Sequence, residues 1–234
     1  MNIYFLVALF SHLMADFTLQ TSRIAAKKAE SYFGVLVHCL IVFGACLACM
    51  LPFGLIGIVY AAGIGVLHFV TDCHKLFYSK KYNPNPLEHF YFDQILHILA
   101  LIALLYLFRI STLPVPAVYA LPCADTMLRT LSIVIVLFGS NTIATALIEQ
   151  IIKKEPPVFA FRSRMKNGFC GALFFLAMLL IGSGIAGTWA GTALLLAASW
   201  LTLRLDRENR RLGNIKLIFH IVWAAALVLL FVIW

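Results

Sequence analysis

The sequence predicts an all-α protein, a polytopic membrane bundle of about eight transmembrane helices. Of its 234 residues, 62% are hydrophobic and only 12% are charged, whereas soluble domains contain about 25% charged residues. The mean hydropathy is +0.95. A soluble core of this size cannot bury so much apolar surface, so lipid is the expected solvent for most of the chain. The same composition excludes a disordered chain and a soluble enzyme.

Eight stretches are apolar enough to cross a bilayer, which takes about 20 residues. Their expected ranges are 3–20, 32–51, 53–74, 90–110, 128–150, 168–185, 187–204 and 214–233. Pro52 separates the second stretch from the third, and the glycine-rich stretch 182–187 separates the sixth from the seventh, so both pairs are predicted to form tight hairpins. A short surface helix is expected near 22–30 and a rigid turn at 82–86. The whole chain, 1–234, is expected to form one integral membrane domain.

The positions of Lys and Arg predict how the chain is oriented. Sixteen of these 18 residues lie in or next to the loops on one side, whereas Arg109 and Arg129 lie on the other. By the positive-inside rule, the protein is a multi-pass protein of the inner or plasma membrane with both termini outside the cytoplasm. The net charge of +8 therefore belongs to cytoplasmic loops and does not indicate a nucleic-acid partner.

Three of the expected helices each carry a His and an Asp four residues apart, on one helical face. The pairs are His12 and Asp16, His68 and Asp72, and Asp93 and His97. The helix with the third pair runs opposite to the other two, so its reversed order again places His deeper and Asp nearer the cytoplasm. Charged groups inside a bilayer are costly and usually functional. The six residues are therefore predicted to converge in one cavity open to the cytoplasm.

Such a set of side chains is typical of a site for one or two divalent metal ions. Imidazole and carboxylate ligands suit Zn, Mn or Fe, and all six residues are proposed ligands. Asp16 and Asp93 are also candidate general bases. Lys75 is expected to turn away from Asp72 toward the interface and to hold an anionic substrate group. His38 and His220 are expected to orient the ligands. An inert polar network that holds the helices together is the alternative interpretation.

The N-terminal half resembles a known family. The stretch from His12 to Gln20 reads His-x3-Asp-Phe-x-Leu-Gln. It is followed by Lys27-Lys28, by His38, by the stretch from His68 to Lys75 and by the stretch from Asp93 to His97. Together they resemble an uncharacterised prokaryotic family of multi-pass membrane proteins, known only as a domain of unknown function. The resemblance covers about residues 8–100, within the motif-bearing helices of 1–110. The second half, 123–234, departs from the family pattern after Gly171, so the resemblance implies no activity.

Three functions remain open from the sequence. The first is a membrane-embedded, metal-dependent hydrolase or transferase that acts on a lipid-linked or anionic substrate from the cytoplasmic side. The second is a proton-coupled or metal-ion transporter, because intramembrane His and Asp residues also mark ion pathways. The third is a non-catalytic scaffold. The spacing of Gly187 and Gly191 allows close helix packing, either within the chain or in a homodimer.

Overall fold

A computed structural model describes residues 2–154 and 161–230, except for the side chains of 161–164. Every regular element in these residues is helical, which confirms the all-α class. The chain divides into two compact units, Met1–Ile135 and Val136–Trp234. The sequence analysis expected a single domain with a change of character between residues 110 and 123. That the two units form one membrane domain stays a prediction.

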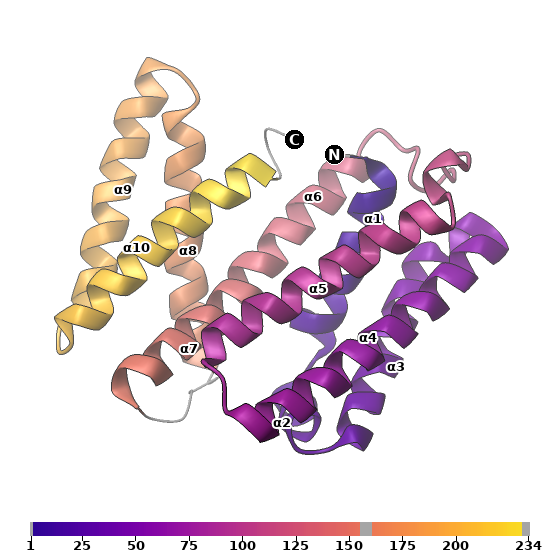
Figure 1. Cartoon of the computed structure of the whole chain (residues 1–234). Coiled ribbons are helices and arrows are strands. Elements are labelled where there is room, and N and C mark those ends of the chain that lie inside the picture. The colour runs from indigo at the N-terminus through magenta and orange to yellow at the C-terminus, as the bar shows by residue number, and fades with distance from the viewer. Residues whose placement is uncertain (1, 155–160, 231–234) are drawn as a thin grey trace. The chain divides into compact units, whose positions relative to one another are not determined.

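The first unit contains the three helices that carry the His and Asp pairs. Its elements are α1 (Ile3–Leu13), the π-helical η1 (Met14–Leu19), α2 (Ser22–Glu30), α3 (Tyr32–Met50), the 3-10 turn η2 (Leu51–Phe53), α4 (Gly54–Tyr82), α5 (Pro86–Leu107), the 3-10 turn η3 (Ile110–Thr112) and α6 (Ala124–Ile135). Helices α3 and α4 lie side by side as a hairpin, and α5 returns alongside α4 (Figure 1). Helix α1 packs against α3, α5 and α6.

Local sequence explains where these helices begin and end. Pro52 and Gly54, whose φ is +69°, make the reversal between α3 and α4, as predicted. At the expected rigid turn, Asn83 adopts a left-handed conformation that ends α4. The side chain of Asn85 then accepts a hydrogen bond from the backbone N–H of Leu87, which caps α5. The expected surface helix is confirmed as α2, which has no buried residue.

Five helical stretches are long and apolar enough to cross a membrane. They are Tyr32–Tyr82, Pro86–Leu107, Ala124–Lys153, Ile185–Leu205 and Arg210–Val228. A sixth is obtained if Ile3–Leu19 and Ser22–Glu30, which meet at 94°, form one broken span. Tyr32–Tyr82 counts as one stretch although it contains the α3–α4 reversal, and Met165–Ile181 is shorter than the others. The structure therefore supports a multi-pass protein, and the count of eight spans stays a prediction.

A tight crossing holds α2 against α3. A β-carbon at Gly34 would lie 2.0 Å from the carbonyl oxygen of Lys27, so α3 meets the backbone of α2 at a position where only glycine fits. The Gly34→Ala variant is expected to lose roughly 1–3 kcal/mol of stability by overpacking, measured by thermal unfolding in detergent. Gly44→Ala is the control, because a β-carbon at Gly44 meets nothing within 4 Å. Equal melting temperatures for the two variants would contradict this account of the crossing.

A dense apolar core fills the first unit on one side of the His residues. It is built from the residues that precede His12 and His68 in the chain and from those that follow His38 and His97. Its fully buried members include Val7, Ala8, Val42, Cys46, Met50, Tyr60, Ala61, Ile64 and Leu101. Tyr60 places its hydroxyl in this core, where it donates a hydrogen bond to the carbonyl oxygen of Leu101 at 3.1 Å.

The second unit consists of the π-helical η4 (Val136–Ser140), α7 (Asn141–Lys153), α8 (Phe161–Ile181), α9 (Ile185–Leu205) and α10 (Arg210–Val228). Helices α8 and α9 form the second expected hairpin, and α10 packs on both (Figure 1). The last residues of the eighth expected span, 231–233, lie outside the described residues. A β-carbon at Gly191 would lie 2.7 Å from the carbonyl oxygen of Ala177, so this glycine serves the α8–α9 contact within the chain.

Lys216, which the sequence places next to the loop after α9, is buried in the second unit. Its side chain is only 1% exposed and forms ion pairs with Glu149 and with Asp206, the latter at 3.3 Å. Asp206 also lies 3.6 Å from the ammonium of Lys166. The network ties α7, α8 and α10 to the α9–α10 turn. A lysine this deep needs such partners, because an unpaired buried charge is strongly destabilising.

Candidate metal centre

The helices of the first unit bring the three predicted His/Asp pairs into one cluster. His12 lies in the last turn of α1, and Asp16 follows in η1. The π-helical turn changes the direction of the side chains that follow it, a feature often found at functional sites. His12 Nε2 lies 3.9 Å from Asp16 Oδ2. No feature of the sequence predicted this π-helical turn.

Helices α4 and α5 place the other two pairs face to face. The imidazole of His68 stacks on that of His97, with ring centroids 3.8 Å apart and an angle of 14° between the planes. Because the two helices are antiparallel, Asp72 comes opposite Asp93, and one oxygen of each lies within 4.8 Å of the other. Two carboxylates this close repel each other strongly unless cations lie beside them.

Four atoms from three elements, η1, α3 and α4, form the closest part of the cluster. Their separations are 3.1 Å for His38 Nε2–His68 Nε2, 3.4 Å for His38 Nε2–Asp16 Oδ1, 3.5 Å for His68 Nε2–Asp16 Oδ1, 3.3 Å for His68 Nε2–Asp72 Oδ2 and 3.7 Å for His38 Nε2–Asp72 Oδ2. Tetrahedral zinc with bonds of about 2.0–2.1 Å has ligand atoms about 3.4 Å apart. The five separations are close to that value, and we call these four atoms the tetrahedral set.

His38 is more central than the sequence analysis expected. The sequence analysis predicts that His38 orients the ligands rather than binding the metal. The structure places its Nε2 within 3.7 Å of three other candidate ligand atoms. The contact with His68 at 3.1 Å has the length of a hydrogen bond between two imidazoles, one donating and one accepting according to tautomer.

The remaining predicted ligands adjoin this group. Ligand atoms of His12, Asp16 and His68 lie within 4.8 Å of one another, and so do those of Asp72, Asp93 and His97. The two groups share residues with the tetrahedral set, so all six predicted side chains and His38 form one continuous cluster. Several of its atoms, among them Asp16 Oδ1 and His97 Nε2, are buried without an aligned hydrogen bond.

Two of the three carboxylates have a lysine beside them. Lys28 Nζ lies 2.7 Å from Asp72 Oδ2, an ion pair by distance, although the approach is too oblique for an aligned hydrogen bond. Lys75 Nζ donates to Asp93 Oδ2 at 2.5 Å. Asp16 differs: it faces the imidazoles of His12, His38 and His68. Within the described part of the chain, no lysine or arginine lies within 4.0 Å of its oxygens.

The ion pair of Lys75 corrects its predicted orientation. As predicted, Lys75 does not pair with Asp72. Contrary to the prediction, its ammonium group does not turn toward the interface but pairs with Asp93. The antiparallel register of α4 and α5 puts a second carboxylate, Asp93, within reach, and the side chain of Lys75 is 27% exposed. The partner of Asp72 is instead Lys28 from α2, a residue of the Lys27-Lys28 pair for which the sequence predicts no partner.

The cluster is enclosed, whereas the sequence predicted a cavity open to the cytoplasm. Each of its seven His and Asp residues is at most 5% exposed. The lysines explain the difference: the stems of Lys28 and Lys75, which are 13% and 27% exposed, lie over the carboxylates and cover them. His220 belongs to the second unit, where its ring stacks on Phe174 with centroids 5.7 Å apart. Its predicted role as an orienting residue stays a prediction.

The fold and this cluster define a class: helical membrane proteins with a buried His/Asp group that could hold a metal ion. The chain belongs to the family described as "Protein of unknown function (DUF3307)", whose model matches residues 4–122. The match contains all seven cluster residues and both lysines. No curated protein matches the chain, and no solved structure does.

Proposed function

We propose that the first unit binds a divalent transition metal, Zn or else Mn or Fe, through Asp16, His38, His68 and Asp72. We further propose that this centre catalyses hydrolysis or group transfer on a lipid-linked or anionic substrate from the cytoplasmic side. The observation that supports metal binding is the spacing of the four ligand atoms, 3.1–3.7 Å for the pairs given above. Mixed imidazole and carboxylate donors favour these metals over Ca or Mg.

The balance of charge in the cluster also favours a cation. Three carboxylates face two ammonium groups, so with neutral imidazoles the cluster carries one uncompensated negative charge, at Asp16. A buried carboxylate without a counter-charge is costly. A divalent ion beside Asp16 and Asp72 would neutralise that charge where the imidazoles of His38 and His68 already converge. It would leave one positive charge in excess, which an anionic substrate group can neutralise.

The neighbouring residues supply the groups that a reaction would need. A metal ion in such a site activates a bound water and polarises a phosphoryl or acyl oxygen. Asp93, outside the tetrahedral set, is the proposed general base, and Asp16 serves as a ligand rather than as a base. Lys75 would exchange its contact with Asp93 for an anionic group of the substrate. His12 and His97 are proposed to complete the metal environment.

The transporter alternative has less support. A path across the membrane needs polar groups or water on both sides of the site. On the far side of the His residues the first unit is filled by the apolar core that includes Val42, Tyr60 and Leu101. An ion that reached the cluster from the cytoplasm would meet this packed layer next.

A scaffold is the second candidate, and one observation favours it. The ion pairs Lys28–Asp72 and Lys75–Asp93 already neutralise two carboxylates without any metal. Such pairs can hold helices in register and fix a unique packing. The scaffold interpretation leaves the charge of Asp16 and the convergence of three imidazoles upon it unexplained.

The membrane placement follows from the same sequence features. We propose eight spans with both termini outside the cytoplasm, since 16 of the 18 Lys and Arg residues then lie at the cytoplasmic side. Lys28 and Lys75 are among them, so the lysine-covered end of the cluster would face the cytoplasm. A homodimer is compatible with this arrangement.

Elemental analysis of the purified full-length protein tests metal binding. After chelation and reloading in detergent with micromolar Zn²⁺, Mn²⁺ or Fe²⁺, the protein is expected to retain about one ion per chain. The matched variants are Asp16→Asn, which should lose the ion, and Asp125→Asn, which should keep it because Asp125 is exposed on α6. A parent protein that retains no ion under any of these conditions would refute the proposal and leave the scaffold.

Catalysis needs a separate measurement. The metal-loaded protein is incubated with a total lipid extract, and released phosphate or acyl products are identified by mass spectrometry. Asp93→Asn should keep the ion and lose the products, because it removes the base but none of the four ligands. A metal-loaded parent that yields no product would retain the metal centre but contradict the enzyme proposal.

A further inference from the structure

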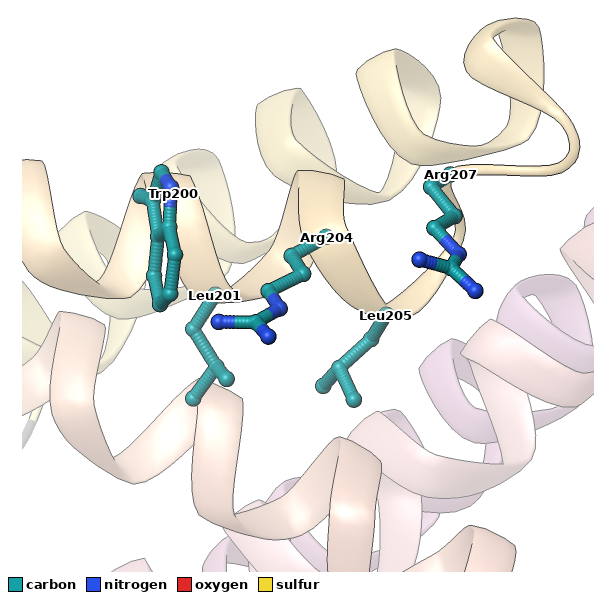
Figure 2. Close-up of a pocket in the computed structure, with 5 residues that line it drawn as sticks. All are labelled: Trp200, Leu201, Arg204, Leu205 and Arg207. Carbon is teal, nitrogen blue, oxygen red and sulfur yellow. The ribbon is translucent and has the colours of Figure 1, made fainter.

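A groove at the end of α9 in the second unit combines apolar and cationic side chains. It is lined by Trp200, Leu201, Arg204, Leu205 and Arg207 and has a volume of about 420 Å³. Figure 2 shows the side chains of Trp200, Leu201, Arg204 and Leu205 along α9, with the guanidinium of Arg204 between the two leucines, and Arg207 on the turn that follows. The metal-centre proposal makes no use of this groove.

The aromatic residue of the groove positions one of its cations. The guanidinium carbon of Arg204 lies 4.8 Å from the centroid of the Trp200 ring, a cation–π contact. The indole is 59% exposed, so this contact is at the surface and not in a packed core. It holds the Arg204 side chain along the helix while its N–H groups remain able to bind a ligand.

The cations of the groove are not neutralised by the protein. Asp206, the carboxylate between them in sequence, lies 3.3 Å from Lys216 and 3.6 Å from Lys166. Among the residues that the structure describes, no carboxylate lies within 4.0 Å of Arg204 or Arg207. Two guanidinium groups therefore face solvent or headgroups, with their hydrogen-bond donors available for an anion.

The location of the groove selects the source of that anion. Ile185–Leu205 is a candidate membrane span, and Arg204 lies in its last turn. Toward the middle of this helix the exposed residues are apolar, as at Leu196, which is 67% exposed. Trp at the end of a span is typical of the headgroup level. A phosphate at the arginines would thus sit above acyl chains that contact the exposed apolar residues deeper in this helix.

We propose that this groove binds the headgroup phosphate of an anionic phospholipid. Arg204 and Arg207 bind the phosphate oxygens, and Leu205 lies beside them at the headgroup level. Trp200 and Leu201, about one turn deeper along α9, contact the glycerol backbone and the upper acyl chain. The guanidinium fork matches phosphate in geometry as well as charge. Clusters of cations just inside the cytoplasmic interface bind anionic lipids by the same attraction.

The test compares two double variants that remove equal charge from neighbouring places. The full-length protein is reconstituted into nanodiscs of phosphatidylcholine and phosphatidylglycerol, and the lipid retained on release is measured by native mass spectrometry. Arg204→Gln with Arg207→Gln is expected to retain at least about tenfold less phosphatidylglycerol than the parent. Arg210→Gln with Arg211→Gln, exposed on the next helix and outside the groove, should retain as much as the parent.

Three results would overturn the site. An equal loss in both double variants would show diffuse attraction to the basic end of the chain, and no loss in either would show no binding there. Complete competition by soluble glycerol phosphate would identify free phosphate as the ligand instead of a lipid. The single variant Arg207→Gln, which keeps the cation–π contact of Arg204, covers the case in which the double variant does not fold; it too should lower retention.

Discussion

The His38→Ala variant is expected to lower metal affinity more than about hundredfold, beyond the largest effect typical of groups that only orient ligands. The reason is the central position of His38 Nε2, which lies 3.1 Å from His68 Nε2 and 3.4 Å from Asp16 Oδ1. Removing it opens one corner of the tetrahedral set. The affinity is measured by titrating the chelated, detergent-solubilised protein with Zn²⁺ against a fluorescent chelator.

The control variant, His74→Ala, and the comparison variant, His97→Ala, also change histidines of the first unit. His74→Ala changes an exposed imidazole on α4 and should leave the affinity unchanged. If His38→Ala retains full affinity while His97→Ala loses it, the ion sits instead among Asp72, Asp93 and His97, the alternative group of the cluster. That result would place the ion on three of the six ligands predicted from the sequence and return His38 to an orienting role.

Sequence periodicity was sufficient to predict the cluster because depth in a membrane helix is set by residue number. His12, His68 and His97 were placed at one level from the spans alone, and their rings do meet: that of His12 lies 5.4 Å from that of His97. The hairpin at Pro52 and the rigid turn at 82–86 followed from single residues whose backbone preferences are strong.

What the sequence could not provide was the pairing of charges between helices. Lys28 reaches Asp72 because α2 folds back onto α3 at Gly34, a contact between helices that no spacing along one helix predicts. The opposition of Asp72 and Asp93 depends on the register of α4 against α5. A signal was present in retrospect: two carboxylates at one depth require two cations, and Lys28 and Lys75 were the nearest on that side.

The division of the chain into two units could not be predicted from the sequence either. The apolar helix Ala124–Lys153 is continuous in composition, so a sequence argument treats it as one span. The boundary between the units nevertheless falls inside it, after Ile135, where the helix becomes π-helical. The burial of Lys216 beside Glu149 also depends on packing within the second unit, and periodicity places it only near a loop.

Lys28→Met is expected to destabilise the metal-free protein by about 3–5 kcal/mol, because it leaves the carboxylate of Asp72 buried without a counter-charge. Asp72 is only 1% exposed, and Lys28 Nζ at 2.7 Å is its nearest cation. Thermal unfolding in detergent after chelation measures the loss. Lys27→Met is the matched control, one residue away on the exposed face of α2, and should change little.

The double variant and added metal then separate the two functions proposed for the cluster. Lys28→Met with Asp72→Asn should recover much of the stability in either case, since it removes both charges of the pair. In the metal-centre proposal an ion takes over the neutralisation of Asp72, so saturating Zn²⁺ should restore the melting temperature of Lys28→Met but not that of the double variant. In a scaffold, Zn²⁺ restores neither. Equal stability of Lys28→Met and Lys27→Met in the chelated protein would contradict both, because it would mean that the Lys28–Asp72 pair carries no charge that the fold depends on.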